Sequence, residues 1–267
     1  MTTQAYVLLE YKAIIFYAYK SGNSSLVEWI YEFVKPNTTK GINLKRKRAL
    51  LSSPNIGIRA SLAFNLIRKH GFNGAILVRN PYSRAASGFI NKFVRDGDIW
   101  LNVNRGYEKC AIELMADSPK FSFIDYLNAI RSYRLNSIEN RLNLHFKSQV
   151  NPVHSGLLKH LRIMKIENIA SDLSEFCVEN GIPYTELPRE RSTSIKNTQP
   201  IDGDASDIDC FELAQRNQLP THDQLLSRDA IALINEIYEI DFLSLGYEKR
   251  ESESAFLSSP HACLEGG

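Results

Sequence analysis

Continuous apolar runs, each followed by a turn and then by residues with helical spacing, recur along the chain. Residues 13–18 read Ala-Ile-Ile-Phe-Tyr-Ala, which is typical of a buried strand, and a Ser-Gly-Asn turn comes soon after them. Residues 75–78 form a second such run, and residues 161–166 are a third strand candidate. Strand–loop–helix units of this kind predict an α/β fold, in which helices flank a parallel sheet.

The first two strands are followed by apolar residues at helical spacing. The first helix should end before Pro36, and Ser25 with Glu28 three residues later fits a capping box at its start. The second helix should begin at Asn80-Pro81, since proline favours the first helical position. The expected inward positions of these two helices are Leu26, Trp29, Ile30, Phe33 and Val34, then Ala85, Ala86, Phe89, Ile90 and Phe93.

Further helices and one long loop are predicted in the second half of the chain. A third helix should start near Ser171, bury Leu173, Phe176 and Cys177, and stop at Gly181. Helices are also expected over 121–133 and 227–240. The stretch 189–222 is rich in Ser, Thr, Asn, Asp and Pro and has no sustained periodicity, so it is predicted to be largely loop.

The composition fits one globular domain with an appended tail. A chain of 267 residues, 43% of them hydrophobic, can bury a full core. We expect a domain over residues 1–250 and a disordered tail over 251–267, because the tail is Ser-rich and holds few core-forming side chains. The 32 Lys and Arg residues nearly balance 30 acidic residues, so neither nucleic acid nor a membrane surface is an expected partner.

The cysteines and the N-terminal region bear on the compartment. The four cysteines, Cys110, Cys177, Cys210 and Cys263, form no CxxC pair, which argues against a zinc site and against a dense disulfide framework. The apolar run 13–19 is too short to span a bilayer and lacks the flanks of a signal peptide. We therefore expect a soluble, cytoplasmic protein with no integral membrane segment.

The loop after the first strand has the composition of a phosphate site. Free N–H groups and the helix dipole favour an anion at a helix N-terminus. The loop supplies a lysine charge, a glycine that allows close backbone approach, and several hydroxyls. Its residues are Lys20, Ser21, Gly22, Asn23, Ser24 and Ser25. The lysine precedes the glycine, unlike in a Walker A loop, which disfavours an ATPase. An ordinary turn with a helix cap is the alternative interpretation.

The junction after the second strand offers a second anion site. Arg79 stands at the end of the strand, and Ser87 lies two turns into the helix, on the same face as Ser83. An arginine there can grip a phosphate bidentately, with a hydroxyl as a second donor. The alternatives are that Arg79 pairs with a surface acid and that Ser87 is a small residue at a close helix contact.

Together the two junctions resemble the nucleotide-binding signatures of PAPS-dependent sulfotransferases, in particular the carbohydrate branch, where PAPS is 3′-phosphoadenosine 5′-phosphosulfate. Residues 19–25 are similar to the family's P-K-x-G-x-T-S loop, and residues 79–87 to its R-[DN]-P-x-x-R-x-x-S stretch. Residues 145–149, 164–169 and 237–247 resemble its H-W-x-x-Q, K-x-E-x-L and Y-x-x-D-F-x-x-x-G-Y elements. The chain departs from the pattern at Tyr19, where the family usually has proline.

The resemblance implies an enzyme with a P-loop-like, nucleotide-kinase-like fold that transfers a sulfuryl group from PAPS to a hydroxyl of a carbohydrate, releases 3′,5′-ADP and needs no metal. It assigns Lys20, with the backbone of residues 21–25, to the bridging and 5′-phosphate oxygens. Arg79 and Ser87 would hold the 3′-phosphate. His145 would be the general base, and Arg191 and Asn197 stand in a loop that closes over the nucleotide in relatives.

Other interpretations stay open at this point. His145 could instead brace a loop, and Glu167 could be a base or a structural partner of Lys165. The basic run 45–48 could attract an acidic glycan or form a solvated face. A nucleotide-dependent kinase or other phosphoryl transferase would also place phosphates at strand–helix junctions. A catalytically inactive glycan-binding relative would keep the fold without the chemistry.

Overall fold

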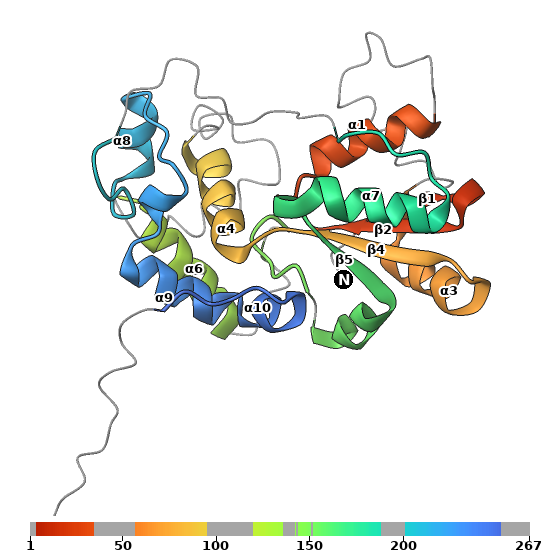
Figure 1. Ribbon diagram of the computed structural model, residues 1–267. Helices are drawn as coiled ribbons and strands as arrows, with labels where there is room; N and C mark the ends of the chain where they lie inside the picture. The colour runs from red at the N-terminus through yellow and green to blue at the C-terminus, as the bar shows by residue number, and fades with distance from the viewer. Residues whose placement is uncertain are drawn as a thin grey trace, which may run out of the picture.

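The computed structural model describes residues 4–34, 57–94, 120–135, 142, 144–150, 152–187 and 201–251. Within them a five-stranded sheet has the order β3-β1-β2-β4-β5; Figure 1 labels β1, β2, β4 and β5. The strands are β1 (Gln4–Leu8), β2 (Ala13–Tyr17), β3 (Gly57–Arg59), β4 (Asn73–Val78) and β5 (Leu161–Lys165). The three predicted strands, β2, β4 and β5, are mutually parallel. β1 runs antiparallel to both β2 and β3, so the sheet is mixed and not parallel throughout.

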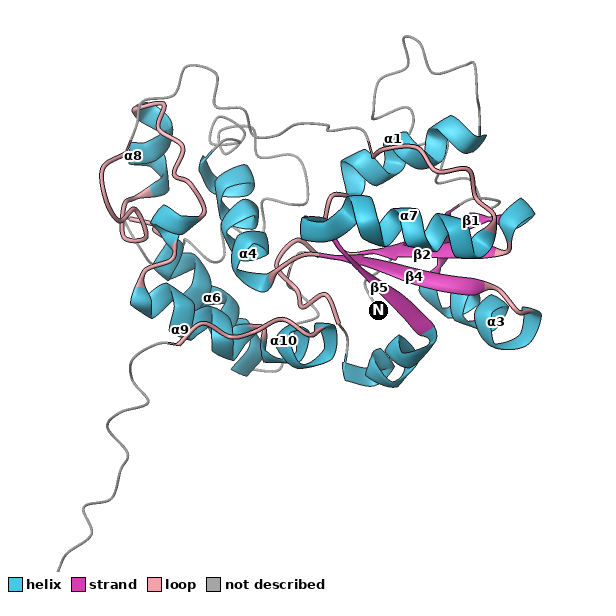
Figure 2. Cartoon of the chain, viewed as in Figure 1, coloured by secondary structure: helices cyan, strands magenta, loops and turns pink. Residues whose placement is uncertain are grey.

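Helical segments cover both faces of the sheet (Figure 2). On one face lie α1 (Asn23–Val34) and α7 (Ile169–Asn180); on the other lie α3 (Ala60–His70) and the 3-10 segment Pro152–His160. Side chains alternate along β2, so that Ile15 packs in the α1 and α7 core and Ile14 in the α3 core. Burial on both sides explains why the strand sequences are continuous apolar runs.

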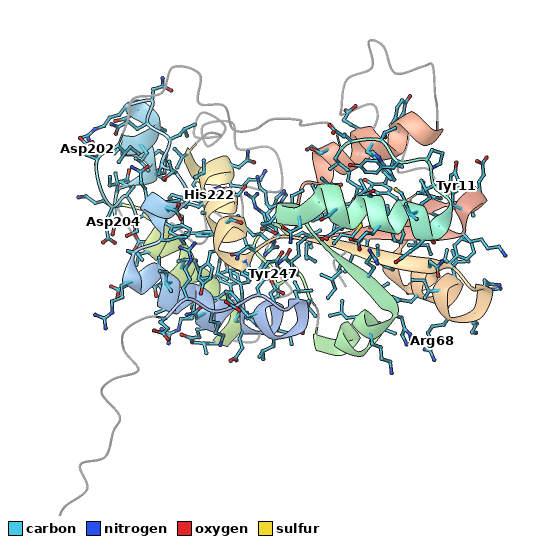
Figure 3. All side chains as sticks on the ribbon, viewed as in Figure 1. Tyr11, Arg68, Asp202, Asp204, His222 and Tyr247 are labelled. Carbon is cyan, nitrogen blue, oxygen red and sulfur yellow. The ribbon has the colours of Figure 1, made fainter. Side chains whose placement is uncertain are left out.

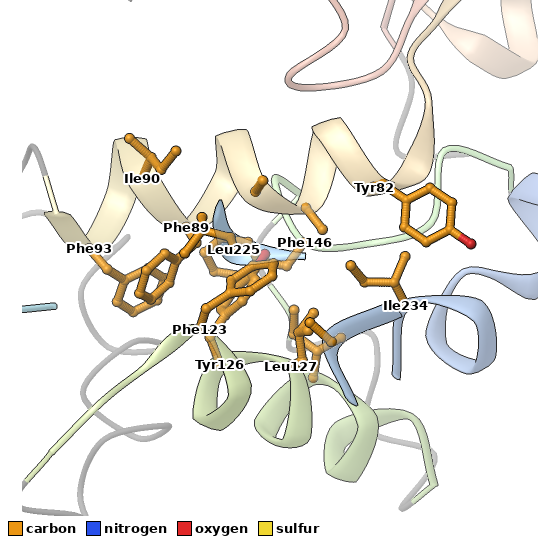
Figure 4. Packing of buried hydrophobic residues seen from close by; sticks show 14 of the residues in the cluster. Tyr82, Phe89, Ile90, Phe93, Phe123, Tyr126, Leu127, Phe146, Leu225 and Ile234 are labelled. Atoms are coloured by element: carbon orange, nitrogen blue, oxygen red, sulfur yellow. The ribbon is translucent and has the colours of Figure 1, made fainter. Parts of the chain in front are cut away.

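A second group of helices lies beyond the carboxyl ends of β2, β4 and β5 (Figure 1). It contains α4 (Pro81–Phe89), which continues as a π-helical turn (Ile90–Val94), together with α6 (Phe123–Leu135), α8 (Cys210–Gln215), α9 (Arg228–Ile237) and α10 (Glu239–Leu245). Its core is aromatic: the rings of Phe89 and Tyr126 contact each other, and each also contacts the rings of Phe93 and Phe123 (Figure 4). Burial of these rings anchors α4 against α6.

Several predicted boundaries are wrong, for local reasons. The first helix begins at Asn23, so Ser25 lies within its first turn and does not start a capping box with the buried Glu28. The helix expected over 227–240 is two helices, α9 and α10, with a break at Tyr238. The stretch 189–222 was predicted to be largely loop, and its described part, 201–222, is irregular except for the short helix α8. The side chain of Asp209 caps α8 by accepting from the N–H groups of Phe211 and Glu212.

Other sequence predictions hold where the structure describes them. α4 is capped by the side chain of Asn80, with Pro81 as its first residue. α7 ends at Gly181, which has a left-handed backbone. Cys177 and Cys210 are buried free thiols, and burial raises the pKa of Cys177 to about 11. The two other cysteines and the tail 252–267 lie outside the described residues. No described helix is long and apolar enough to cross a membrane.

Candidate functional site

The loop between β2 and α1 has a tightly constrained backbone. Lys20 and Gly22 both have left-handed conformations, with φ of 70° and 81°. A β-carbon on Gly22 would lie 2.5 Å from Ile166 Cδ1, so only glycine fits here without a shift. The N–H of Leu26 donates to the carbonyl of Gly22 (3.1 Å) at the start of α1. The loop therefore delivers the chain to a helix N-terminus, the arrangement that favours a bound phosphate.

The junction between β4 and α4 lies directly against this loop. Arg79 Nη1 donates to the carbonyl oxygen of Lys20 (3.2 Å), and its Nε donates to Ser83 Oγ (3.0 Å). The side chain of Asn80 accepts from the N–H of Tyr82 (3.0 Å) and caps α4. Two strand–helix junctions that are 59 residues apart in the chain thus meet at one place.

Gln149 joins the two junctions through one carboxamide. Its Oε1 accepts from Ser21 Oγ and from the N–H of Arg79, both at 2.9 Å. Its Nε2 donates to the carbonyl of Arg79 at 2.8 Å. Gln149 stands in the segment that resembles the family's H-W-x-x-Q element, but the sequence alone indicated no role for it. The hydroxyl of Ser21, which is fully buried, is directed at this glutamine.

Asp241 on α10 fixes the segment that carries Gln149. Its two carboxylate oxygens accept from the backbone N–H groups of Gln149 and Val150, each at 2.9 Å. Burial raises the pKa of the Asp241 carboxyl, while Arg84 and the Gln149 and Val150 N–H donors act in the opposite direction. The paired N–H donors hold the segment 149–150 at a fixed distance from α10.

Arg84, in the first turn of α4, connects the first loop to the segment that contains His145. This buried guanidinium donates from Nε to the carbonyl of Tyr19 (3.0 Å) and from Nη2 to the carbonyl of Lys147 (2.6 Å). A guanidinium provides several hydrogen-bond donors in a rigid plane, so one side chain can bind the backbone carbonyls of two separate segments. Sequence analysis noted Arg84 only as part of the motif.

Glu167 braces the second junction. One of its carboxylate oxygens accepts from the N–H of Asn80 (2.8 Å) and the other from the hydroxyl of Tyr247 (2.9 Å). Lys165 does not pair with it in the structure, because Lys165 Nζ donates to the carbonyl of Gly246 (2.7 Å). Tyr247 lies between the helical group and the strand ends, whereas Tyr11 and Arg68 lie at the opposite end of the sheet (Figure 3). These bonds favour a structural role for Glu167.

The electrostatics of Arg79 are those of a partly desolvated cation. Burial lowers the pKa of Arg79, the carboxylate of Glu167 opposes that shift, and the charge of Arg84 adds to it. His222, which no sequence pattern singled out, is close enough for Arg79 to affect it. Burial first and then Arg79 lower the pKa of His222 to about 4, with Asp223 acting in the opposite direction. Its imidazole is therefore neutral at pH 7.

The remaining predicted site residues differ in how the structure places them. The ring of His145 lies against that of Tyr19, with centroids 4.7 Å apart, which brings His145 next to the loop of Lys20. The Oδ1 atom of Asn23 is buried and has no hydrogen-bond partner among the described residues. Ser24, Ser25 and Ser87 are half-buried. Arg191, Asn197 and the basic run 45–48 lie outside the described residues.

The site is assembled at the carboxyl end of the parallel strands from two helix N-termini, a lysine and an arginine. Such an arrangement is typical of α/β proteins that bind phosphorylated ligands. Among the described side chains, no group of three or more His, Cys, Asp or Glu residues could hold a metal ion.

Comparison with known families identifies the class of enzyme. Residues 10–248 match the model of the sulfotransferase family, so the chain belongs to that family and is a sulfotransferase. Enzymes of this family generally use PAPS as the sulfuryl donor. No curated protein matches the chain, and no solved structure does.

Proposed function

We propose that this sulfotransferase binds PAPS across the two strand–helix junctions and transfers its sulfuryl group to a hydroxyl of a carbohydrate. The observation that carries the proposal is the contact between the junctions, in which Arg79 Nη1 lies 3.2 Å from the carbonyl oxygen of Lys20. A nucleotide with a phosphate on each side of its ribose needs two adjacent anion sites. We assign the catalytic domain to residues 1–250.

The protein groups at the two junctions have the chemistry needed to bind this nucleotide. The left-handed loop at Lys20 and Gly22 and the N-terminus of α1 suit the 5′-phosphosulfate, with Asn23, Ser24 and Ser25 as further loop contacts. Ser21 would contribute through its backbone, because its hydroxyl donates to Gln149. Arg79, whose guanidinium is partly desolvated, and Ser87 suit the 3′-phosphate. Arg191 and Asn197 remain proposed contacts of the nucleotide. PAPS supplies the activated sulfuryl group.

Two residues are proposed to act on the reacting atoms. Lys20 would stabilise the negative charge that develops on the oxygen between sulfur and the 5′-phosphate as the S–O bond breaks. His145, which lies beside the Lys20 loop through its contact with Tyr19, would accept the proton of the acceptor hydroxyl. The carbohydrate acceptor is supported by the resemblance of residues 19–25 and 79–87 to the carbohydrate branch of the family.

Transfer of radiolabelled sulfate from PAPS to a panel of glycans and other hydroxyl acceptors tests the proposal. We expect a labelled glycan with the wild-type protein and a loss of about 10²- to 10³-fold in rate with Lys20→Ala, as for removal of other groups that stabilise transition-state charge. Lys12→Ala is the matched control, because Lys12 also has a left-handed backbone but stands at the opposite end of β2. An unchanged rate in Lys20→Ala would refute the role of this lysine.

Calorimetric titration separates the proposal from a kinase that uses the same sheet edge. We expect 3′,5′-ADP to bind more tightly than either 5′-AMP or ATP, because neither of these has a 3′-phosphate for Arg79. Tight binding of ATP, with indifference to a 3′-phosphate, would favour phosphoryl transfer instead. Binding of glycans without any labelled product would favour an inactive glycan-binding protein.

A further inference from the structure

The carboxamide of Gln149 is fully engaged by the protein itself. Its Oε1 accepts two hydrogen bonds and its Nε2 donates to the carbonyl of Arg79, with a longer approach of 3.5 Å to Asp241 Oδ2. A primary amide has two donor hydrogens and two acceptor lone pairs, so these contacts use its whole capacity. The side chain is 2% exposed. Gln149 therefore acts on the two junctions and has no group left for a ligand.

The hydrogen-bond partners of Gln149 are distant from it in the sequence. Ser21, in the first junction, is 128 residues away in sequence, and Arg79, in the second junction, is 70 residues away. Asp241, 92 residues away, holds the backbone N–H of Gln149 from α10 and is itself fully buried. One side chain thus connects three segments that the chain order keeps far apart, and a small movement of it would displace both junctions.

We propose that Gln149, held by Asp241, is a positioning residue that sets the spacing between the two phosphate-binding junctions, so that the two phosphates of the donor nucleotide bind as one unit. This inference rests on the proposed function. A second phosphate adds affinity only when its site is already at the right distance from the first, which raises its effective concentration. Loosening the connection should therefore weaken a bisphosphate more than a monophosphate.

The decisive quantity is the ratio of the dissociation constant of 5′-AMP to that of 3′,5′-ADP, measured by calorimetry. For Gln149→Ala we expect this ratio to fall by at least about tenfold from the wild-type value, while the affinity for 5′-AMP changes less than that for 3′,5′-ADP. Asn180→Ala is the matched control. The Asn180 carboxamide also joins a strand to a helix, accepting from Asn73 Nδ2 and donating to the carbonyl of Phe176, at the other end of the sheet. The Asn180→Ala variant should leave the ratio of the two dissociation constants unchanged.

A second variant keeps the test available if Gln149→Ala does not fold. Ser21→Ala removes only the hydroxyl that donates to Gln149 Oε1, and we expect the ratio to fall by a smaller factor, about threefold. A folded Gln149→Ala or Ser21→Ala protein with the wild-type ratio would overturn the inference and leave the proposed function standing. A wild-type protein that fails to bind 3′,5′-ADP would overturn both.

Discussion

At the scale of single residues, Gly22 is under two separate constraints. Its φ of 81° is a conformation that residues with a β-carbon rarely adopt, and such a carbon would also lie 2.5 Å from Ile166 Cδ1. Lys20, two residues earlier, adopts a similar φ of 70° despite its side chain. A non-glycine residue held in this region costs about 1 kcal/mol or more, and such strain is found most often at functional sites.

The first prediction concerns Gly22→Ala. We expect the free energy of unfolding to fall by about 2 kcal/mol and the binding of 3′,5′-ADP to weaken, since backbone strain and a steric contact add together. Gly203→Ala is the control, because Gly203 has a φ of 76° with no atom within 4 Å of a β-carbon. Urea unfolding measures the stability of both variants, and calorimetry measures their binding of 3′,5′-ADP. Equal losses for the two variants would show that the contact with Ile166 is unimportant.

The second prediction concerns Arg79→Ala. We expect the affinity for 3′,5′-ADP to fall about 10- to 100-fold, the usual range for a hydrogen bond between charged groups, with a much smaller effect on 5′-AMP. Calorimetry with both nucleotides measures this. The control is Arg162→Ala, because Arg162 on β5 pairs with Glu175 and Glu179 away from the junctions. Equal weakening of both nucleotides by Arg79→Ala would contradict its assignment to the 3′-phosphate.

At the scale of elements, the start of α4 positions Arg79. The side chain of Asn80 caps the helix, and the N–H of the same residue donates to Glu167. Arg79 is the residue directly before this cap, so the direction of its backbone depends on how α4 begins. The aromatic core around Phe89 fixes the other end of the helix (Figure 4).

The third prediction follows from this cap. Asn80→Ala should lower the free energy of unfolding by about 1 kcal/mol, the typical cost of a lost cap, and should also weaken 3′,5′-ADP binding. Ser227→Ala removes the cap that the Ser227 hydroxyl provides for α9 and serves as the control, with a similar loss of stability and unchanged binding. Thermal unfolding and calorimetry on both variants provide the comparison. Unchanged binding of 3′,5′-ADP by Asn80→Ala would show that the Asn80 cap does not position Arg79 for the nucleotide.

Sequence analysis predicted the elements whose signals are local. The strands β2 and β4 were recognisable because their apolar runs are buried on both faces, and the half-buried β5 because it is rich in apolar residues. The start of α4 and the end of α7 were recognisable because Pro81 and Gly181 have strong local preferences. β1 was missed, since its five residues carry no turn signal of their own and are ordered by pairing with β2. α8 was missed because six residues are too few to show a helical period.

At the scale of the whole molecule, the candidate site depends on contacts between distant segments. Lys20, Arg79 and His145 were found through motifs, but their mutual arrangement was not visible in the sequence. It depends on Gln149, Asp241 and Arg84, whose partners are 63 to 128 residues away. Tertiary hydrogen bonds of this kind leave no periodic pattern. All three residues stand in segments that resemble family motifs, but the motifs alone did not indicate which groups they would contact.

The fourth prediction concerns stability against pH. Because the pKa of His222 is about 4 in the folded protein and its ordinary value is 6.5, the unfolded chain binds more protons between these values. The free energy of unfolding should therefore decrease as the pH falls from about 6.5 to about 4. His222→Gln should reduce this decrease, and His70→Gln, at the exposed end of α3, should not. Urea unfolding at a series of pH values tests it, and identical profiles for wild type and His222→Gln would contradict the assignment.

The central claim is that the two junctions hold opposite ends of one bisphosphorylated nucleotide. A crystal structure with 3′,5′-ADP tests it most directly. We predict the 5′-phosphate at the N-terminus of α1 within hydrogen-bond distance of Lys20, and the 3′-phosphate within hydrogen-bond distance of Arg79. A nucleotide bound elsewhere, or one whose 3′-phosphate makes no contact with Arg79, would contradict the account.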